Sequence, residues 1–200
     1  MSRLICITGP DGAGKSTLIK LLSEKLESVA VSNIWDIMEG GITNVPFKSK
    51  KDVDDYLCEL TPHSRLLFLA HALKYSTDKA IATGKEYVLL NGYYYKYFAS
   101  ELALGANEGR VNELIGFFPQ ADKVFYLEVS PEEAAKRKSR LSRYECGLVK
   151  EPSVKDFISF QYKAVYFRDF FERSNREIVD SSHGAERILE QVYGRIMNNG

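Results

Sequence analysis

The segment Gly9–Ser16 (GPDGAGKS) constrains the fold more than any other part of this sequence. It matches the pattern G-x-x-x-x-G-K-[ST] and lies between an apolar run, Leu4–Thr8, and a stretch with helical spacing, Ser16–Leu26. Glycines let backbone N–H groups turn inward around phosphate oxygens, and the following helix directs the positive end of its dipole at them. The segment therefore predicts a buried strand, a phosphate-binding loop and a helix, in that order.

Strand and helix patterns alternate along the rest of the chain. Four further apolar or β-branched runs predict strands: Val29–Ile37, Tyr87–Leu90, Lys123–Val129 and Ile178–Val179. Helical spacing and capping residues predict helices at Pro62–Thr83, Tyr94–Leu104, Val111–Phe118, Val154–Phe171 and Ala185–Met197, and another after Ser130. Such alternation is typical of a parallel sheet covered by helices on both faces. We therefore predict one α/β domain, residues 1–200, with a five-stranded parallel sheet.

Composition excludes several classes of function. The 27 Lys and Arg residues balance 27 Asp and Glu, so bulk charge does not favour a coat on nucleic acid or an anionic membrane. The cysteines Cys6, Cys58 and Cys146 are far apart and odd in number, which favours a reducing compartment over a disulfide framework. No targeting segment and no apolar stretch of about 20 residues is present. We expect a cytoplasmic protein whose partners are small molecules, without nucleic acid or membrane.

Two polar segments inside the domain, 39–51 and 139–152, have the composition of loops that cover an active site. The second begins within Lys136–Arg143, where five cations occur in eight residues and no acid interrupts them. A mobile lid with such charge would close over a transferred phosphate and exclude water. We expect a lid at about 139–152, with Arg137, Arg140 and Arg143 as its catalytic cations. A solvated basic helix end is the alternative interpretation.

These features favour a small-molecule kinase among the proteins with a phosphate loop. A GTPase would usually carry an N-K-x-D motif, which this sequence lacks, and a motor ATPase usually needs a longer chain. In a kinase, Lys15 should reach the β- and γ-phosphates, Ser16 should bind Mg²⁺, and Asp11 should orient the acceptor. We expect ATP to be bound by the following residues: Gly9, Gly12, Ala13, Gly14, Lys15, Ser16 and Thr17.

At this level the sequence resembles the thymidylate kinase family of nucleoside monophosphate kinases. The resemblance runs through most of the chain and rests on Asp11 within the loop and on these segments: His63–Ala70, Tyr87–Tyr93, Val124–Arg137, Arg143–Glu145 and Val179–Ser181. It implies transfer of phosphate from ATP to dTMP with Mg²⁺, a P-loop kinase fold, and a homodimer, which the family often forms. It also implies that Phe68 stacks on the acceptor base, although packing in the core is the alternative interpretation. We further expect Tyr144 to lie against the acceptor base.

The sequence departs from the family pattern in the acceptor half of the site. Asn91-Gly92 stands in place of an Asp-Arg pair, whose Asp helps to hold the Mg²⁺ shell and whose Arg holds the acceptor phosphate. The arginine expected shortly after Phe68 is absent, since Ala72 and Leu73 occupy that place, and residues 36–41 contain no cation. Hydrogen bonds between an arginine and a phosphate are stronger than bonds between neutral groups. Loss of these arginines should therefore weaken monophosphate binding by several kcal/mol.

Three hypotheses account for this pattern. In the first, the protein phosphorylates dTMP and other cations substitute, with four candidates: Arg65, Lys74, Lys96 and Arg110. In the second, a kinase of the same fold takes a different, less charged acceptor. Tyr93, which opens the tyrosine-rich run Tyr93–Tyr97, would then offer a stacking face and a hydroxyl to it, although a packed aromatic cluster is the alternative interpretation. In the third, the chain is a non-catalytic ATP-binding module.

Overall fold

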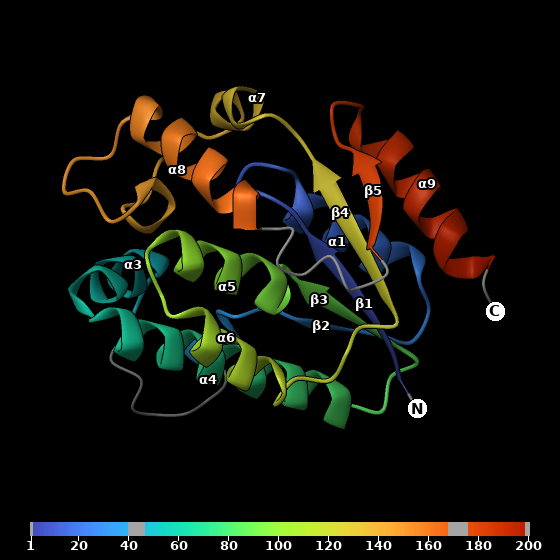
Figure 1. Ribbon diagram of the computed structural model, residues 1–200. Helices are drawn as coiled ribbons and strands as arrows, with labels where there is room; N and C mark the ends of the chain where they lie inside the picture. The colour runs from blue at the N-terminus through green and yellow to red at the C-terminus, as the bar shows by residue number, and fades with distance from the viewer. Residues whose placement is uncertain (1, 40–46, 168–175, 199–200) are drawn as a thin grey trace.

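A five-stranded, all-parallel sheet forms the centre of the computed structural model, which describes residues 2–39, 47–167 and 176–198 (Figure 1). The strands lie in the order β2-β3-β1-β4-β5. Their bounds are β1 Arg3–Thr8, β2 Val29–Ser32, β3 Tyr87–Asn91, β4 Lys123–Glu128 and β5 Arg176–Asp180. The predicted α/β class and the parallel sheet are therefore confirmed.

Helices cover both faces of this sheet. Their bounds are α1 Lys15–Lys25, α2 Asp36–Glu39, α3 Lys50–Glu59, α4 Pro62–Ala82, α5 Tyr93–Ala103, α6 Glu108–Ile115, α7 Pro131–Lys136, α8 Val154–Tyr166 and α9 Ala185–Met197. Thr61 and Ser130 cap α4 and α7, and Pro62 and Pro131 fill the first helical positions, where a missing N–H costs nothing. No helix among the described residues is long and apolar enough to cross a membrane.

The alternation of side chains along β1 divides the core into two layers. Ile5 and Ile7 pack with the buried residues of α1 and α9 on one face. Leu4 and Cys6 pack with those of α4 and α5 on the other. Strands buried on both faces read as continuous apolar runs, which is the pattern LICIT shows in the sequence. Figure 1 shows α4, α5 and α6 on one side of the sheet and α9 on the other.

The structure corrects the predicted second strand. Val29–Ile37 was expected to be extended, but the strand ends at Ser32 and a short helix, α2, follows. The cause is a local turn: the Asn33 N–H donates to the Asp36 carboxylate at 2.9 Å, and the Asp36 N–H donates to the Asn33 carbonyl at 2.9 Å. Short polar side chains that bond the nearby backbone in this way compete with a strand ladder.

The expected loop segments also contain helices. Of the predicted loop 39–51, residues 40–46 lie outside the described residues, and α3 begins at Lys50, with the Ser49 side chain accepting the Asp52 N–H. Segment 139–152 contains a short 3₁₀ turn, η1, at Tyr144–Cys146. Helix α8 ends at Tyr166, and the rest of the predicted helix up to Phe171 falls largely outside the described residues.

The chain leaves β1, β3 and β4 at the same edge of the sheet, because all the strands run in parallel. The phosphate loop follows β1, Gly92 follows β3, and α7 with segment 139–152 follows β4. Ligands of open parallel sheets bind in the crevice beyond the carboxyl ends of the strands. The fold thus brings the loop, α5 and η1 to one region.

Candidate active site

The glycines of the phosphate loop are required by close backbone contacts. Gly9 has φ +138° and a Cβ there would lie 2.5 Å from the Leu127 carbonyl oxygen. Gly12 has φ +81° and its Cβ would lie 2.6 Å from the Ala134 carbonyl oxygen. Any side chain at either position would collide with backbone. The loop therefore keeps its curvature only with glycine at these two positions.

The Lys15 side chain is folded back into this loop. Its Nζ donates to the carbonyl oxygens of Gly9 at 3.0 Å and Pro10 at 2.6 Å, and the residue is 8% exposed. Burial and, second, the neighbouring Lys96 charge lower the pKa of the Lys15 ammonium to about 7. A poorly solvated ammonium is strongly stabilised by a bound polyanion such as a nucleotide phosphate. Binding phosphate is the role that the sequence predicts for Lys15.

Asp11 and Lys96 form the second charged feature of the site. Lys96 Nζ lies 2.5 Å from Asp11 Oδ1, and each side chain is largely buried. Burial alone would raise the pKa of the Asp11 carboxyl, but the ammonium groups of Lys96 and Lys15 lower it to about 2. Burial would likewise lower the pKa of Lys96, and the Asp11 carboxylate instead raises it above its ordinary value. Both groups are therefore charged at neutral pH.

Ser16 and Asn91 lie close together at the N-terminus of α1. Asn91 Nδ2 lies 3.4 Å from Ser16 Oγ, so the end of β3 faces the start of α1. Rotating the amide places its oxygen there instead, because the two orientations are equivalent in shape. The described residues hold no cluster of three His, Cys, Asp or Glu side chains suited to a metal ion. Mg²⁺ at phosphates needs only one or two protein oxygens besides water, so this pair fits it.

A cleft of about 740 Å³ opens beside the loop. Its aromatic wall consists of Trp35, Tyr97 and Tyr144. The cations that line it are Lys15, Lys50, Lys51, Lys96, Lys138, Arg140, Arg143 and Lys150. The carboxylates that line it are Asp11, Asp54, Asp55 and Glu145. An aromatic wall within a positive rim suits a ligand that has a flat ring and negative charge.

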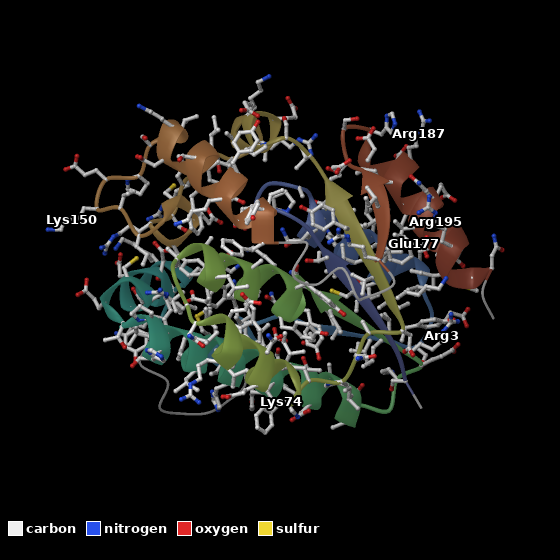
Figure 2. The ribbon with its side chains drawn as sticks, viewed as in Figure 1. Arg3, Lys74, Lys150, Glu177, Arg187 and Arg195 are labelled. Carbon is white, nitrogen blue, oxygen red and sulfur yellow. The ribbon has the colours of Figure 1, made fainter. Side chains whose placement is uncertain are left out.

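The turn η1 is docked onto α3 by one carboxylate. Asp54 accepts the backbone N–H of Arg143 at 2.9 Å and that of Tyr144 at 3.0 Å. Arg143 also extends toward Asp55 and Glu59, with its Nη1 at 4.0 and 3.9 Å from their carboxylates. Segment 139–152 is therefore held over the cleft by α3 in this structure. Lys150 marks the outer end of the segment in Figure 2.

A buried ionic network stands behind Tyr144. Its hydroxyl donates to Glu101 at 2.9 Å, and Glu101 accepts Arg65 Nε at 2.9 and 3.0 Å. The Arg65 and Glu101 side chains are 2% and 0% exposed. A buried pair of this kind is costly to break, since either partner alone would be an uncompensated charge. The network fixes Tyr144 in the cleft wall.

A glutamine connects the loop to η1. The backbone N–H of Asp11 donates to Gln161 Oε1 at 3.1 Å, and Gln161 Nε2 donates to the Glu145 carbonyl oxygen at 3.1 Å. Lys138 Nζ pairs with the Glu145 carboxylate at 2.6 Å. The phosphate loop, α8 and η1 are thus joined by hydrogen bonds that use both ends of one buried amide.

Most of the site residues expected from the sequence meet at the cleft. These are Asp11, Gly12, Gly14, Lys15, Ser16, Thr17, Arg140, Arg143 and Tyr144. Gly9 and Ala13 belong to the same loop without lining the cleft. The roles assigned to these residues in catalysis and binding stay predictions.

Three expected site residues lie elsewhere. Phe68 is half-buried between Phe47 and Tyr56, with ring centroids 5.9 and 5.4 Å away. Tyr93 is 1% exposed and its hydroxyl donates to the Pro119 carbonyl at 2.9 Å. Arg137 donates through Nη2 to the Ser181 carbonyl at 3.1 Å. None of the three is among the described residues that line the cleft.

Of the four candidate substitute cations, Lys96 alone lines the cleft. Lys74 pairs with Asp78 on the outer side of α4 (Figure 2), Arg110 pairs with Glu113 on the surface, and Arg65 is buried against Glu101. Helical spacing is the signal that distinguishes Lys96 in the sequence, because it follows Gly92 by one turn. Trp35 and Asp54 also line the cleft, and no sequence pattern marks them, whereas Lys138 belongs to the basic run Lys136–Arg143.

A phosphate loop between β1 and α1 of a five-stranded parallel sheet, with a positive cleft beside it, defines a P-loop kinase. A family model described as thymidylate kinase matches residues 7–192, and the chain belongs to that family. The predicted family and enzyme class, a nucleoside monophosphate kinase, are therefore confirmed.

Similar proteins cover the full length of the chain. A probable thymidylate kinase 1 of Saccharolobus solfataricus is 27% identical over 206 residues, covering 100% of this chain and 99% of its own. A probable thymidylate kinase of Methanocaldococcus jannaschii is 24% identical over 196 residues, covering 97% and 95%. Among solved structures, deoxyadenosine kinase from M. mycoides with bound dATP superposes with a TM-score of 0.64 over 97% of this chain and 98% of its own. The two sequences are 18% identical, so this superposition shows a shared fold and nothing more.

Proposed function

We propose that this protein transfers the γ-phosphoryl group of ATP to dTMP, giving dTDP and ADP. The observation that carries the proposal is the position of Lys15 and Ser16 at a positive cleft of about 740 Å³ in a member of the thymidylate kinase family. Phosphoryl transfer needs positioning and charge stabilisation more than covalent help from the protein. The cleft supplies both.

The donor half of the site is the phosphate loop. Its backbone N–H groups and the start of α1 bind the phosphates, and Lys15 leaves the carbonyls of Gly9 and Pro10 to contact the β- and γ-oxygens. Ser16 would hold Mg²⁺, with Asn91 beside it. When bound, the ion neutralises negative charge that the nucleotide phosphates carry.

The acceptor half lies toward Trp35, Tyr97 and Tyr144. These rings offer apolar faces to a nucleotide base, and Tyr144 is held by Glu101. Arg140 and Arg143 belong to the segment that covers the cleft, where their charges can contact phosphate oxygens when the segment closes. Closure of residues 139–152 would also exclude water, which competes with the acceptor for the phosphoryl group.

The proposal has two further parts, of which the first rests on the scattered cysteines and the second on the family resemblance. The protein works in the cytoplasm, and two copies of the chain associate as a homodimer. Sedimentation at micromolar protein concentration tests the second part directly, because a dimer and a monomer of 22.7 kDa separate clearly.

A panel assay tests the proposed reaction. The protein is incubated with Mg·ATP and, in turn, with dTMP, other nucleoside monophosphates, deoxynucleosides and small alcohols, and ADP release is followed. We expect release with dTMP at a kcat on the order of 1–100 s⁻¹. ADP release with a deoxynucleoside but not with dTMP would contradict the proposed acceptor. ATP binding without acceptor-dependent ADP release would indicate a binding module instead.

A further inference from the structure

The turn that follows β3 has an unusual backbone. Gly92 has φ +75° and Tyr93, a bulky residue, has φ +50°. Positive φ is uncommon outside glycine, and a bulky residue adopts it only where the surroundings enforce it. Such residues cluster at functional sites. This turn stands at the place where the family pattern has its Asp-Arg pair.

The surroundings of Tyr93 enforce this conformation. Its ring is 1% exposed and packs against Tyr94 and Phe118, with centroids 4.6 and 5.6 Å away. Its hydroxyl donates to the Pro119 carbonyl at 2.9 Å. The Gly92 N–H donates to the Ile7 carbonyl at 2.8 Å, which ties the turn to β1. Tyr93 therefore acts as an anchor for the start of α5.

The anchored turn lets the Lys96 side chain pass over Gly92. A Cβ at Gly92 would lie 3.3 Å from Lys96 Cδ and 3.5 Å from Lys96 Cβ. The second distance is ordinary van der Waals contact, whereas the first is tight, so a Cβ at position 92 requires the Lys96 stem to shift by a few tenths of an ångström. The lysine stem thus occupies the space that a side chain from position 92 would need. Glycine at this position lets the Lys96 stem lie against the backbone on its way to the phosphate loop.

The ammonium of Lys96 ends beside the phosphate loop. Its Nζ lies 2.5 Å from Asp11 Oδ1 and 4.8 Å from the centroid of the Tyr97 ring. Its charge acts on Lys15, whose pKa it lowers. Lys138 and Glu145 lie close to these groups and also line the cleft, so three lysines face two carboxylates and positive charge is in excess. A phosphoryl group between donor and acceptor would relieve this repulsion.

We propose that Lys96 is a catalytic residue whose ammonium contacts the oxygens of the transferred phosphoryl group. Its stem passes over Gly92, which has no side chain. This inference rests on the proposed function. An ammonium has three donors, so Lys96 can keep Asp11 and still bind a phosphate oxygen. Asp11 is then the positioning residue that holds it. The Asp11–Lys96 pair thus brings a cation to the cleft beside position 92, where glycine has no side chain of its own.

Lys96 acts through charge and gives up no proton. An oxygen of the acceptor phosphate forms a bond to the γ-phosphorus, and the bond from that phosphorus to the β,γ-bridging oxygen breaks. ADP leaves with the electron pair of the broken bond. The negative charge on the equatorial oxygens is stabilised by Lys96 from one side and Lys15 from the loop. The raised pKa of Lys96 keeps its ammonium protonated throughout.

Steady-state kinetics of Lys96→Met and Lys96→Arg test this role. We expect Lys96→Met to lower kcat for dTMP about 10²–10³-fold, the loss seen when one donor to a transition-state charge is removed. The KM for ATP should stay within about threefold, because the loop backbone and Lys15 still bind the donor. Lys96→Arg should recover part of kcat. Lys74→Met, which removes a lysine on the outer side of α4, is the matched control and should keep the wild-type kcat.

Substitution of Gly92 tests the position of the lysine without removing it. Gly92→Ala should shift the Lys96 stem by a few tenths of an ångström and lower kcat about three- to tenfold. Gly84→Ala is the matched control, because Gly84 has φ +65° and open space around its Cβ position. Both alanines should lower the melting temperature by similar amounts, and Gly84→Ala should keep kcat. This comparison remains decisive if Lys96→Met fails to fold because Asp11 is left buried without its partner.

The outcomes separate the two proposals. Wild-type protein that phosphorylates dTMP while Lys96→Met and Gly92→Ala keep its kcat would overturn the role of Lys96 and leave the proposed function intact. Wild-type protein that binds ATP but phosphorylates no acceptor would overturn the proposed function, and a catalytic role for Lys96 with it. A loss of kcat in both variants, with both controls unaffected, supports the inference.

Discussion

The buried ammonium of Lys15 has a direct consequence for nucleotide binding. Without ligand its pKa is lowered to about 7, so a substantial fraction is neutral at physiological pH. Phosphate oxygens favour the charged form, so ATP binding raises this pKa and draws a proton from solvent. Affinity is then fully present below the pKa of the free protein and falls as pH rises through it.

This coupling predicts proton uptake on ATP binding. At about pH 8, where most Lys15 is neutral before binding, we expect uptake that approaches one proton per ATP. Calorimetric titrations in two buffers with different ionisation enthalpies measure it. Equal binding enthalpies in both buffers would show that Lys15 is already charged, contrary to the burial seen in the loop.

Removal of the Lys15 charge should abolish turnover while the fold remains. We expect Lys15→Ala to lower kcat about 10²–10³-fold, because the phosphate loop loses the cation that it directs at the γ-phosphate. Lys20→Ala, at an exposed position of α1, is the matched control. Turnover by Lys15→Ala at the wild-type rate would exclude the phosphate loop as the catalytic element.

At the scale of elements, Asp54 links α3 to the turn that covers the cleft. One carboxylate accepts two backbone N–H groups, those of Arg143 and Tyr144. Charge-assisted bonds to backbone are stronger than neutral ones, and an amide keeps only one acceptor oxygen. The position of η1 should therefore depend on Asp54 more than on any sequence feature of η1 itself.

The Asp54→Asn variant tests this link. We expect it to lower the free energy of unfolding by about 1–2 kcal/mol and to make residues 139–152 cleave faster in limited proteolysis. Asp78→Asn, which alters an exposed carboxylate paired with Lys74, should change neither. Unchanged proteolysis in Asp54→Asn would mean that other contacts, such as Tyr144 with Glu101 and Lys138 with Glu145, hold the turn without Asp54.

Elements with a strong period or a complete start signal, such as Ser130-Pro131 before α7, could be predicted, and short elements in polar segments could not. Strand β1 and helix α4 were predicted within a residue of their bounds, because an apolar run and a proline-headed helix leave few alternatives. Strand β2 was predicted too long, because Asp36 bonds back to Asn33 and turns the chain. Helix α3 was missed, because its start depends on Ser49 in a strongly polar segment.

At the scale of the whole molecule, parallel strands explain why the donor half of the site could be predicted. The loop motif fixes its own geometry, and alternation of strands and helices places it at the carboxyl edge of the sheet. The acceptor half depends on contacts between distant segments, such as Asp11 with Lys96 and Tyr144 with Glu101. The residues of each pair are far apart in the chain, so the spacing of residue types in the sequence does not predict these contacts. Phe68 was expected at the cleft from the family resemblance and Tyr93 from its residue type, and packing places both in aromatic clusters instead.

Formation of dTDP tests the central claim most directly. Purified protein is mixed with Mg·ATP and dTMP, and nucleotides are separated by anion-exchange chromatography after a few turnovers. The structure and the family predict that dTDP and ADP appear in equal amounts and that the Lys15→Ala protein forms neither at a comparable rate. ATP consumption without dTDP, or dTDP formation that is unaffected by Lys15→Ala, would contradict it.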